Sequence, residues 1–301
     1  MTTTPDTTEF SFYISAAGTY YIDWGDGETE TIEKTSTGRQ KISHTYATAN
    51  EYVIKLGGKA TEYIHKIYSN GYGSDDSMIS FYNNLNLGKI DGSLGMIFST
   101  LSDNSQPTFP FTFYNCINLT GGIPENLFAG ISGAPANAMF ASTFEGCSNL
   151  SGPIPQGLFG NLTGSPADFM FNNTFRGCSK LESFIPPTLF SGIDTPDVAT
   201  ATGQMSSVFA NSGIVTQCPV GYYQYMTGFE EYFNGRVSCT PCPAGYTNAG
   251  PGLTSESQCV MTVDPGYYIA NPDDTTPKTV PYQSTPLWSL KRLSSRSRKA
   301  S

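Results

Sequence analysis

The 301-residue chain has few charged side chains and almost no histidine. Only 14% of its residues are charged, two are histidines, and no apolar run approaches the roughly 18–20 residues of a membrane-spanning helix. Its first residues lack the basic and apolar regions of a signal peptide, so we expect any export signal to lie outside this sequence. Gly-x-Ser-x-Gly, phosphate-loop and His-Glu-x-x-His motifs are missing too. A carboxylate-only glycosidase needs no such motif and stays open.

Glycine and proline are abundant, with 31 and 20 residues. This composition predicts a turn-rich, helix-poor, mainly β protein. The net charge of −9 is unevenly distributed along the chain, because residues 281–301 contain five bases and no acids. The other 280 residues therefore carry 11 bases against 25 acids, a net charge of −14. An acidic body argues against nucleic acid as the partner, since that binding depends on neutralising phosphates.

Three copies of one pattern lie 31 residues apart in the middle of the chain. They read TFYNCINLTGGIPENLF at 112–128, TFEGCSNLSGPIPQGLF at 143–159 and TFRGCSKLESFIPPTLF at 174–190. Phe, Cys and Leu recur together in every copy, which predicts an inward-facing set that stacked units bury and a single unit does not. These predicted core residues are Phe113, Cys116, Leu119, Phe144, Cys147, Leu150, Phe175, Cys178 and Leu181.

Weaker copies flank the three units. Residues 81–98 match the first half of a unit, with Asn84 at the cysteine position, and residues 204–214 resemble a unit that stops early. Incomplete end units are typical of solenoids, because a terminal unit has one face without a neighbour. We therefore expect a solenoid of 31-residue repeats with caps over 78–215. Within each unit we expect a short strand near the Ile-Pro pair and one or two helical turns in the Met-Phe segment.

The repeated cysteines are interpreted as packing positions. Zinc needs four nitrogen or sulfur ligands around one point, whereas stacking places three thiols in a column without a histidine. Free cysteine is commonly buried. We expect no metal, cofactor or catalytic residue here, and we expect a partner to contact the variable positions between the core residues. The candidate binding surface comprises Asn115, Ile117, Glu145, Ser148, Arg176 and Lys180.

The repeated Phe-x-x-Cys-x-x-Leu, followed by Ile-Pro-x-x-Leu-Phe, resembles the BspA-like leucine-rich repeats of bacterial and protozoan surface proteins. In that family alanine commonly precedes the phenylalanine, and the period is near the low twenties. This chain has threonine at 112, 143 and 174 and a longer unit. The resemblance implies a surface-exposed leucine-rich-repeat-like solenoid, and the longer unit leaves the horseshoe geometry open.

The N-terminal segment contains short runs rich in aromatic and β-branched residues, with glycine and asparagine between them. These runs predict antiparallel strands of a small β-sandwich over 10–77, after a disordered lead at 1–9. The predicted strands lie at 10–14, 19–24, 31–34, 41–46, 51–56 and 61–68.

DWGDG at 23–27, followed by HTY at 44–46 and NEYVIKL at 50–56, resembles a polycystic-kidney-disease (PKD) type domain. The resemblance implies an extracellular spacer or interaction module in which His44 is structural. It also implies a structural turn made by Trp24, Gly25, Asp26 and Gly27. Two close carboxylates, Asp23 and Asp26, fall short of the six to eight oxygens that calcium takes, so turn stabilisation is preferred to calcium binding.

Cys-Pro-x-Gly-Tyr occurs twice after the repeats, at 218–222 and 242–246. CTPC at 239–242 has the spacing of a redox motif but no βαβ pattern around it, and a disulfide module is favoured over a zinc site. The pattern resembles the ephrin-receptor-like cysteine-rich modules of extracellular proteins. That resemblance implies a module at 216–270 in an oxidising compartment. It implies disulfides joining Cys218 to Cys239 and Cys242 to Cys259, although four cysteines allow three connectivities.

Residues 271–301 are polar and then basic, and we expect them to be disordered. Together these features predict a non-enzymatic cell-surface or secreted protein that adheres to a host or neighbouring-cell protein or matrix through its repeats. A glycan is the alternative ligand, and neither a nucleic-acid partner nor a membrane span is expected. An accessory segment of a secreted hydrolase and a purely structural surface stalk are the competing interpretations.

Overall fold

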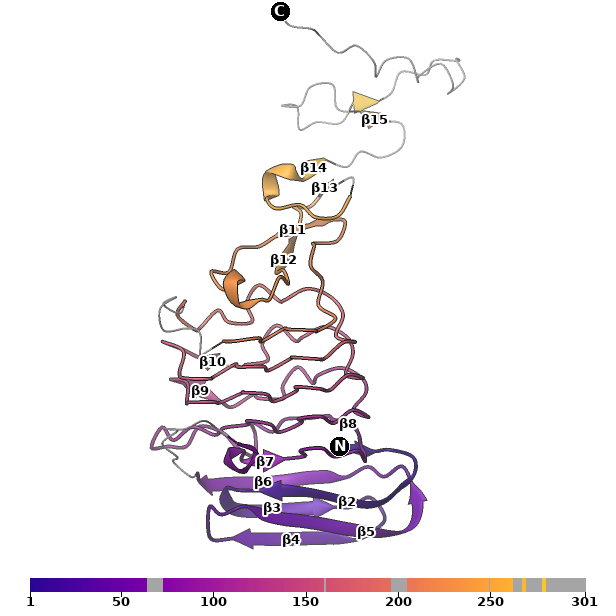
Figure 1. The fold of residues 1–301 in the computed structure, drawn as a ribbon, viewed down its shortest axis with the longest axis vertical. Helices are drawn as coiled ribbons and strands as arrows, with labels where there is room; N and C mark the ends of the chain where they lie inside the picture. The colour runs from indigo at the N-terminus through magenta and orange to yellow at the C-terminus, as the bar shows by residue number, and fades with distance from the viewer. Residues whose placement is uncertain are drawn as a thin grey trace, which may run out of the picture.

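A computed structural model describes residues 1–63, 73–159, 161–195, 205–248 and 250–261, and the backbone of two strands at 267–268 and 278–279. The described part is mainly β and elongated, with sheets at one end and hairpins at the other (Figure 1). It contains no α-helix. Its only helical segments are short 3-10 turns: η1 (Ser74–Asp76), η3 (Glu230–Tyr232) and η4 (Glu256–Gln258).

Two three-stranded antiparallel sheets form the N-terminal end, with strand orders β5-β2-β7 and β4-β3-β6. Along β2, Phe10, Phe12 and Ile14 are buried and alternate with more exposed residues, so one face of the strand points into a core. Trp24, which follows β3 in the other sheet, lies 6.2 Å from Phe12 between ring centroids. The strands are β2 (Thr7–Ile14), β3 (Ala17–Asp23), β4 (Thr29–Lys34), β5 (Gln40–Asn50), β6 (Lys55–Glu62) and β7 (Ile79–Ser80).

The expectation of a disordered lead at 1–9 is wrong. The strand β1 (Thr2–Thr3) pairs with β8 (Leu87–Lys89), and β2 begins at Thr7. Thr3 and Thr7 are at most 1% exposed. The lead is ordered because it lies between the sheets and the first repeat and hydrogen-bonds to both: the Thr3 N–H donates to the Tyr52 carbonyl oxygen at 2.9 Å, and β1 pairs with β8.

The expectation of separate strands at 51–56 and 61–68 is also wrong. One strand, β6, runs through Gly57 and Gly58 to Glu62, and residues 64–68 lie outside the described part of the chain. Gly58 has a φ of +115°, and a Cβ there would lie 2.1 Å from the Thr19 carbonyl oxygen. Glycine therefore allows β6 to approach β3 closely, and the glycine pair does not end the strand.

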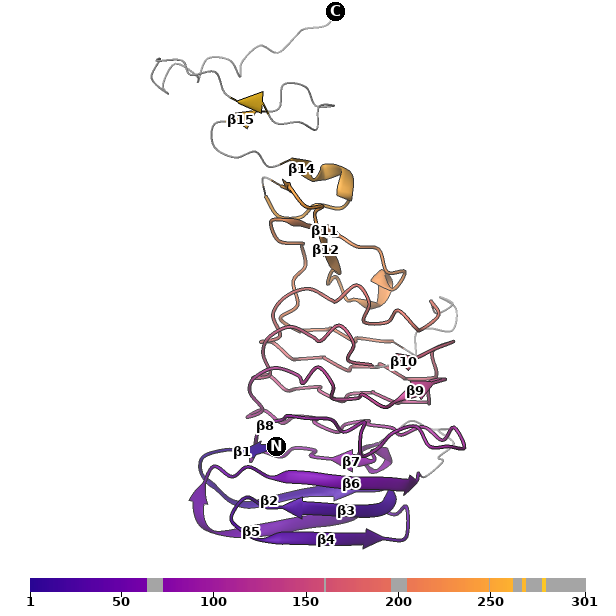
Figure 2. The same ribbon diagram turned by 180° about the vertical axis from the view of Figure 1, so that it is seen from behind.

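The repeats extend both N-terminal sheets. The Ala60 N–H of β6 donates to the Ile97 carbonyl oxygen at 2.9 Å, and the Phe81 N–H after β7 donates to Thr112 at 2.7 Å. Figures 1 and 2 show the layers following one another along the long axis. The sheets therefore cover the N-terminal end of the stack.

Successive repeats are joined at equivalent positions by backbone hydrogen bonds. The Phe113 N–H donates to Thr143 at 2.8 Å, and the Phe144 N–H donates to Thr174 at 2.9 Å. On another side of the stack, β9 (Ser132–Gly133) pairs in parallel with β10 (Asn161–Leu162). Parallel pairing at one repeat length keeps each residue type above its copy.

Each repeat is a series of tight turns. Within a unit, backbone N–H groups donate to carbonyls three residues earlier, as Cys116 does to Phe113 at 3.1 Å. The helical turns expected in the Met-Phe segment do not form. Ala138 and Ser142 have φ values of +55° and +53°, and left-handed residues interrupt an α-helix. Near the Ile-Pro pairs the described residues form isolated bridges, such as Gly121 to Leu150, instead of strands.

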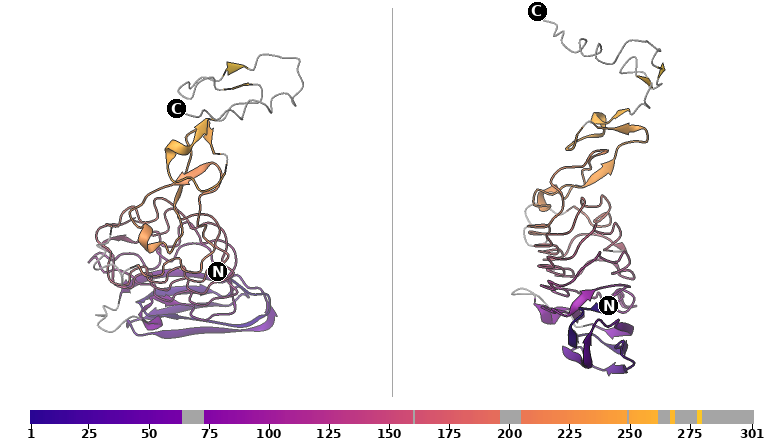
Figure 3. Two further views of the ribbon diagram at one scale, coloured as in Figure 1. Left: turned by 45° about the horizontal axis from the view of Figure 1, so that its top comes forward. Right: turned by 90° about the vertical axis from the view of Figure 1, so that its right-hand side faces the viewer.

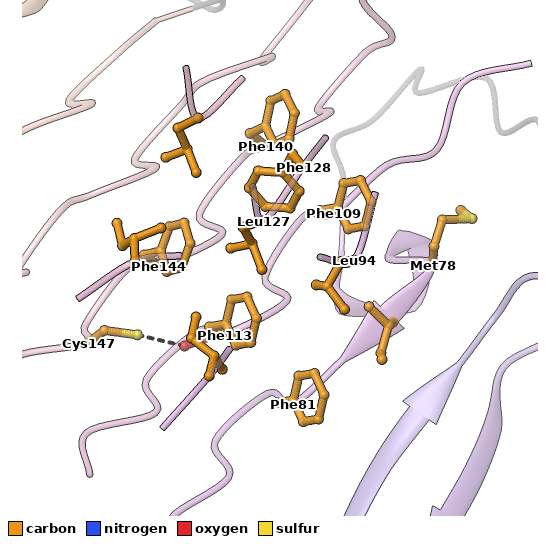
Figure 4. Packing of buried hydrophobic residues seen from close by; sticks show 14 of the residues in the cluster. Met78, Phe81, Leu94, Phe109, Phe113, Leu127, Phe128, Phe140, Phe144 and Cys147 are labelled. Atoms are coloured by element: carbon orange, nitrogen blue, oxygen red, sulfur yellow. Dashed lines mark hydrogen bonds between the residues drawn. The ribbon is translucent and has the colours of Figure 1, made fainter. Parts of the chain in front are cut away.

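A column of stacked phenylalanine rings runs through the repeats. Its neighbours are 5.4, 5.3, 5.6 and 5.5 Å apart between ring centroids, in the order Phe81, Phe113, Phe144, Phe175 and Phe209. Each is at most 1% exposed. Figure 4 shows the first three inside the stack, with Phe109 and Phe140 of a second column beside them. Phe81 also stacks on Phe12 of β2 at 5.4 Å, so one core links the sheets to the repeats.

Among the residues that the structure describes after the repeats, three short hairpins are present, and Figure 3 shows them continuing the long axis. The third includes two residues of the segment 271–301, for which we expected no structure; the rest of that segment lies outside the described residues. The hairpins pair β11 (Tyr222–Gln224) with β12 (Cys239–Pro241), β13 (Tyr246–Thr247) with β14 (Val260–Met261), and β15 (Tyr267–Tyr268) with β16 (Lys278–Thr279).

The loop inside the first hairpin closes the C-terminal end of the repeats. Phe229 and Phe233 are 4% and 0% exposed. The Phe233 ring lies 5.7 Å from Phe209, and the Phe229 ring lies 5.3 Å from Phe190. The core of the repeats therefore extends past residue 215, the expected boundary, into the cysteine-rich segment.

Candidate functional site

The six variable positions of the repeats lie together on one side of the stack. Glu145 and Arg176 form an ion pair of 3.0 Å between neighbouring layers. Asn149 Nδ2 donates to the Ile117 carbonyl oxygen at 2.7 Å, and Lys180 Nζ donates to Asn149 Oδ1 at 2.6 Å. Ser148 and Asn115 join the same network through backbone atoms: the Ser148 carbonyl oxygen accepts a bond from Ser179 Oγ at 3.3 Å, and the Asn115 N–H donates to Glu145 at 2.7 Å.

Asn115 also has a backbone role that its exposure does not reveal. Its φ is +56°, and the equivalent positions in the next two repeats are Gly146 and Gly177, with φ values of +78° and +76°. Glycine and asparagine are the residues that most readily adopt this region. A mutation of Asn115 therefore changes the turn as well as the surface.

An exposed apolar cluster includes one of these positions, Ile117, and sequence reasoning missed its other members. Tyr82 is 39% exposed, Leu85 52% and Ile117 40%. The Tyr82 and Tyr114 rings stack at 5.0 Å, and Phe111 lies 5.2 Å from Tyr114. We call Tyr82, Leu85, Phe111, Tyr114 and Ile117 the aromatic patch.

The repeat alignment contains the signal for this patch. Tyr82 and Tyr114 occupy the column that holds Glu145 and Arg176 in later repeats, and Leu85 occupies the column of Ile117. The outward columns are therefore apolar near the N-terminal sheets and polar further along. Tyr114 is the last aromatic residue of its column, stacked on Tyr82 and followed by Glu145 in the next repeat. Desolvation, and after it the charge of Glu145, raise the pKa of the Tyr114 hydroxyl.

The repeat cysteines are structural hydrogen-bond donors. Cys147 Sγ donates to the Phe113 carbonyl oxygen at 2.9 Å (Figure 4), and Cys178 Sγ donates to Phe144 at 3.0 Å. Burial raises the pKa of Cys116 to about 12, so its thiolate is not available near neutral pH. Asn84, at the cysteine position of the first unit, makes the corresponding bond by donating from Nδ2 to Ser11 at 2.8 Å.

The core positions of the repeats are all buried, each at most 1% exposed: Phe113, Cys116, Leu119, Phe144, Cys147, Leu150, Phe175, Cys178 and Leu181. None of them reaches the surface that carries the variable positions. The repeats thus separate residues that pack from residues that face a partner.

The WGDG turn holds the two N-terminal sheets together. The Trp24 ring is 2% exposed and stacks on His44 with centroids 4.9 Å apart. His44 Nε2 lies 2.7 Å from Asp26 Oδ2, and this hydrogen bond lowers the pKa of Asp26 below its usual value. Gly25 has a φ of +86°, and Gly27 has a φ of +101°. The carboxylate of Asp26 is therefore occupied within the turn.

Two disulfides close the first two hairpins. Cys218 bonds to Cys239, and Cys242 bonds to Cys259. This is the pairing that the resemblance implied. Among the described residues, no group of three or more His, Cys, Asp or Glu side chains is placed to hold a metal ion. The same part of the chain contains no helix with the length and apolar character needed to span a membrane.

Comparison with known proteins matches one segment of the chain. Residues 209–259 match the family described as tyrosine-protein kinase ephrin type A/B receptor-like. The match includes both disulfides and the loop with Phe229 and Phe233. No curated protein and no solved structure matches the chain.

Proposed function

We propose that this chain is part of an extracellular, non-enzymatic adhesion protein that binds another protein through the aromatic patch. The exposed stack of Tyr82 and Tyr114 is the observation that carries this proposal. Exposed apolar clusters rimmed by polar groups are typical of protein-binding surfaces, and tyrosine and arginine are enriched there. Here Tyr114 lies beside the ion pair of Glu145 and Arg176.

The architecture that we propose has three parts in tandem. A PKD-like β-sandwich formed by β2 to β7 (Thr7–Ser80) comes first, a BspA-like leucine-rich-repeat solenoid of the 31-residue repeats follows, and an ephrin-receptor-like module over 209–259 is the third part. Two sheets with a shared core support the first part, and hydrogen bonds at the repeat period support the second. The family match and two disulfides support the third and favour an oxidising, extracellular location.

The proposal assigns binding and no reaction to the patch. Its rings and the Glu145–Arg176 pair supply apolar area and charge for contact. An extended side of a stack of repeats suits a protein partner that crosses several layers.

Binding of the full chain to purified matrix and cell-surface proteins tests the proposal. Tyr82→Ser and Ile117→Ser remove side chains that are 39% and 40% exposed, so the fold is kept. Each is expected to weaken binding about tenfold or more, as expected for central contacts. Tyr225→Ser, at a tyrosine that is 43% exposed in the first hairpin, is the matched control and should leave binding unchanged.

Two outcomes contradict the proposal. One is that no purified extracellular protein binds the chain, which favours a purely structural stalk. The other is that Tyr225→Ser weakens binding as much as Tyr82→Ser does.

A further inference from the structure

The outward face of the sheet β4-β3-β6 carries one prominent exposed ring. Tyr21 of β3 is 56% exposed, whereas its chain neighbours Tyr20 and Ile22 are 0% and 2% exposed. Side chains alternate across a strand, so Thr19 and Asp23 share the outward face with Tyr21. This face lies away from the shared core, and none of its residues belongs to the aromatic patch.

The pairing of the sheet leaves the flank of this ring open. Tyr21 is opposite Thr31 on β4 and Gly57 on β6. A Cβ added to Gly57 would meet nothing within 4 Å. Gly57 therefore leaves space beside Tyr21 in which a side chain would fit. Such a side chain would also stabilise the strand, because glycine weakens a strand interior and is depleted there.

A hollow of about 390 Å³ lies at this place. Its lining includes Tyr21, Asp23, Thr31, Lys55 and Leu56. Asp23 Oδ2 and Lys55 Nζ are 2.9 Å apart across the strands. The lining therefore presents one ring, hydroxyl groups, a closely paired carboxylate and ammonium, and the further carboxylate of Glu30.

The hollow continues toward the first repeat. A second hollow, also of about 390 Å³, shares Lys55 and Leu56 with the first and extends to Asp91, Ser93 and Leu94. Binding sites for small ligands usually have volumes of roughly 300–1,000 Å³. The two hollows meet at Lys55 and Leu56 of β6, and we call the pair the furrow, whose combined lining suits a ligand of more than one ring.

We propose that this furrow binds a neutral oligosaccharide, with Tyr21 as the stacking residue. A pyranose has an apolar C–H face, which packs on an aromatic ring, and a rim of hydroxyls, each of which both donates and accepts hydrogen bonds. Tyr21 supplies the ring. Asp23 accepts, Lys55 donates, and Thr31 does both. Asp23 and Lys55 neutralise each other, and the carboxylates of Glu30 and Asp91 disfavour an acidic ligand, so we expect a neutral one.

This site is separate from the protein-binding patch and does not depend on it. A peptide is the competing ligand for the furrow. Peptide side chains gain most from pockets lined by several apolar side chains, whereas Tyr21 is the only large exposed hydrophobic side chain in the lining of this hollow, and the threonine hydroxyls, Asp23, Glu30 and Lys55 supply polar groups around it. The ring with its polar rim therefore favours the sugar.

Native gels that contain a neutral glucan, galactan, mannan or xylan test the proposal, with the full chain as the migrating protein. At least one of these polysaccharides is expected to retard the chain. Tyr21→Ala is expected to weaken this interaction about tenfold, as measured from retardation against polysaccharide concentration. Tyr82→Ala, at the exposed tyrosine of the aromatic patch, is expected to leave retardation unchanged.

Gly57→Val separates loss of the site from damage to the fold. Valine fits the space beside Tyr21 and favours strands, so the variant is expected to keep or raise the unfolding temperature while it abolishes retardation. The proposal is overturned if none of the four polysaccharides retards the chain, or if Tyr21→Ala is retarded as the parent is. If Tyr82→Ala abolishes retardation and Tyr21→Ala does not, the glycan binds at the repeats, and the proposal is overturned as well. If no polysaccharide binds, and if peptides from a library bind the parent but not Tyr21→Ala, then the ligand of the furrow is a peptide and not a sugar.

Discussion

The stacked repeats and the second hairpin hold their chains together in different ways. In the repeats, every layer adds a buried phenylalanine to a column that continues above and below it. In the second hairpin, among the described residues between Cys242 and Cys259, only Cys242 and Asn248 are buried. A segment without a hydrophobic core needs covalent links. The repeats are therefore held together by packing between neighbouring layers, and the second hairpin is held by its disulfide.

The first hairpin lies between these two cases. It has a disulfide, Cys218 to Cys239, yet its loop contributes Phe229 and Phe233 to the core of the repeats. The Ile185 N–H also donates to the Val237 carbonyl oxygen at 2.9 Å. The disulfide therefore holds the loop that covers the last layer.

The largest effect is expected from a change inside the phenylalanine column. Phe144→Ala removes a ring that contacts both neighbouring layers, and large-to-small changes at such sites cost about 3–5 kcal/mol. Urea unfolding of the repeats should show this loss. Glu145→Ala, at the next residue on the outside of the same layer, should cost less than about 1 kcal/mol. Equal losses in the two variants would mean that the column does not carry the stability.

Removing the two disulfides one at a time should raise amide exchange over regions of different extent. Closing a loop of this size stabilises by about 3 kcal/mol, and the two bonds join residues 21 and 17 apart. With Cys218 and Cys239 both replaced by serine, amide exchange should rise in the hairpin and also at Ile185 and Phe209. With Cys242 and Cys259 replaced by serine, it should rise only in the second hairpin. Unchanged exchange at Phe209 in the first variant would contradict a capping role.

The buried thiols should destabilise the repeats at alkaline pH. Burial raises the pKa of Cys116 to about 12 and also raises the pKa of Cys147, whereas a thiol in the unfolded chain ionises near roughly 8.5. A group whose pKa is raised by folding contributes to the free energy of unfolding. That contribution is fully present below the pKa of the group in the unfolded chain, and it is lost as the pH rises toward the pKa of the group in the folded protein. The free energy of unfolding should therefore be constant from about pH 7 to 8 and fall above, by about 1 kcal/mol per thiol near pH 9.5.

Urea midpoints across this pH range measure the effect. Cys147→Val, which has no ionisable group, should show a smaller decline. Iodoacetamide at about pH 8 should leave the three repeat thiols unlabelled in the native protein and label all three in urea. Native labelling of Cys147 would contradict the burial argument.

The smallest effect is expected at the surface of the stack. Arg176→Ala breaks a partly exposed ion pair with Glu145, in which the arginine side chain is 49% exposed and the glutamate side chain 14%, and pairs near a surface contribute about 0–1 kcal/mol. The urea midpoint should therefore hardly change. A loss as large as that of Phe144→Ala would show that contacts between outward side chains, as well as the buried column, hold the layers together.

The repeat period and the inward residues could be read from the sequence because burial in a stack repeats with the unit. The Phe, Cys and Leu that recur at 31-residue spacing are the residues that lie in the core. The course of β6 could not be read, since Gly57 and Gly58 usually mark a turn. Their place inside a strand depends on how closely β3 passes by, and β3 is distant in the sequence.

The candidate surfaces were predictable only in part for the same reason. The variable positions beside the core, such as Glu145 and Arg176, follow from the alignment of the repeats. The aromatic patch requires the first, incomplete unit to stack in register on the second, which brings Tyr82 against Tyr114. The furrow at Tyr21 requires β6 to lie beside β3, which places Gly57 next to the ring.

The sequence by itself determined the 31-residue unit, the residues that each unit buries, and the stretch that needs cysteine bridges, because these depend on local composition and period. Only the tertiary structure decided what covers the two ends of the stack and which outward side chains meet. Phe12 covers one end through Phe81, and Phe233 covers the other through Phe209. These contacts join segments far apart in the chain, and their choice depends on the shape of the whole core.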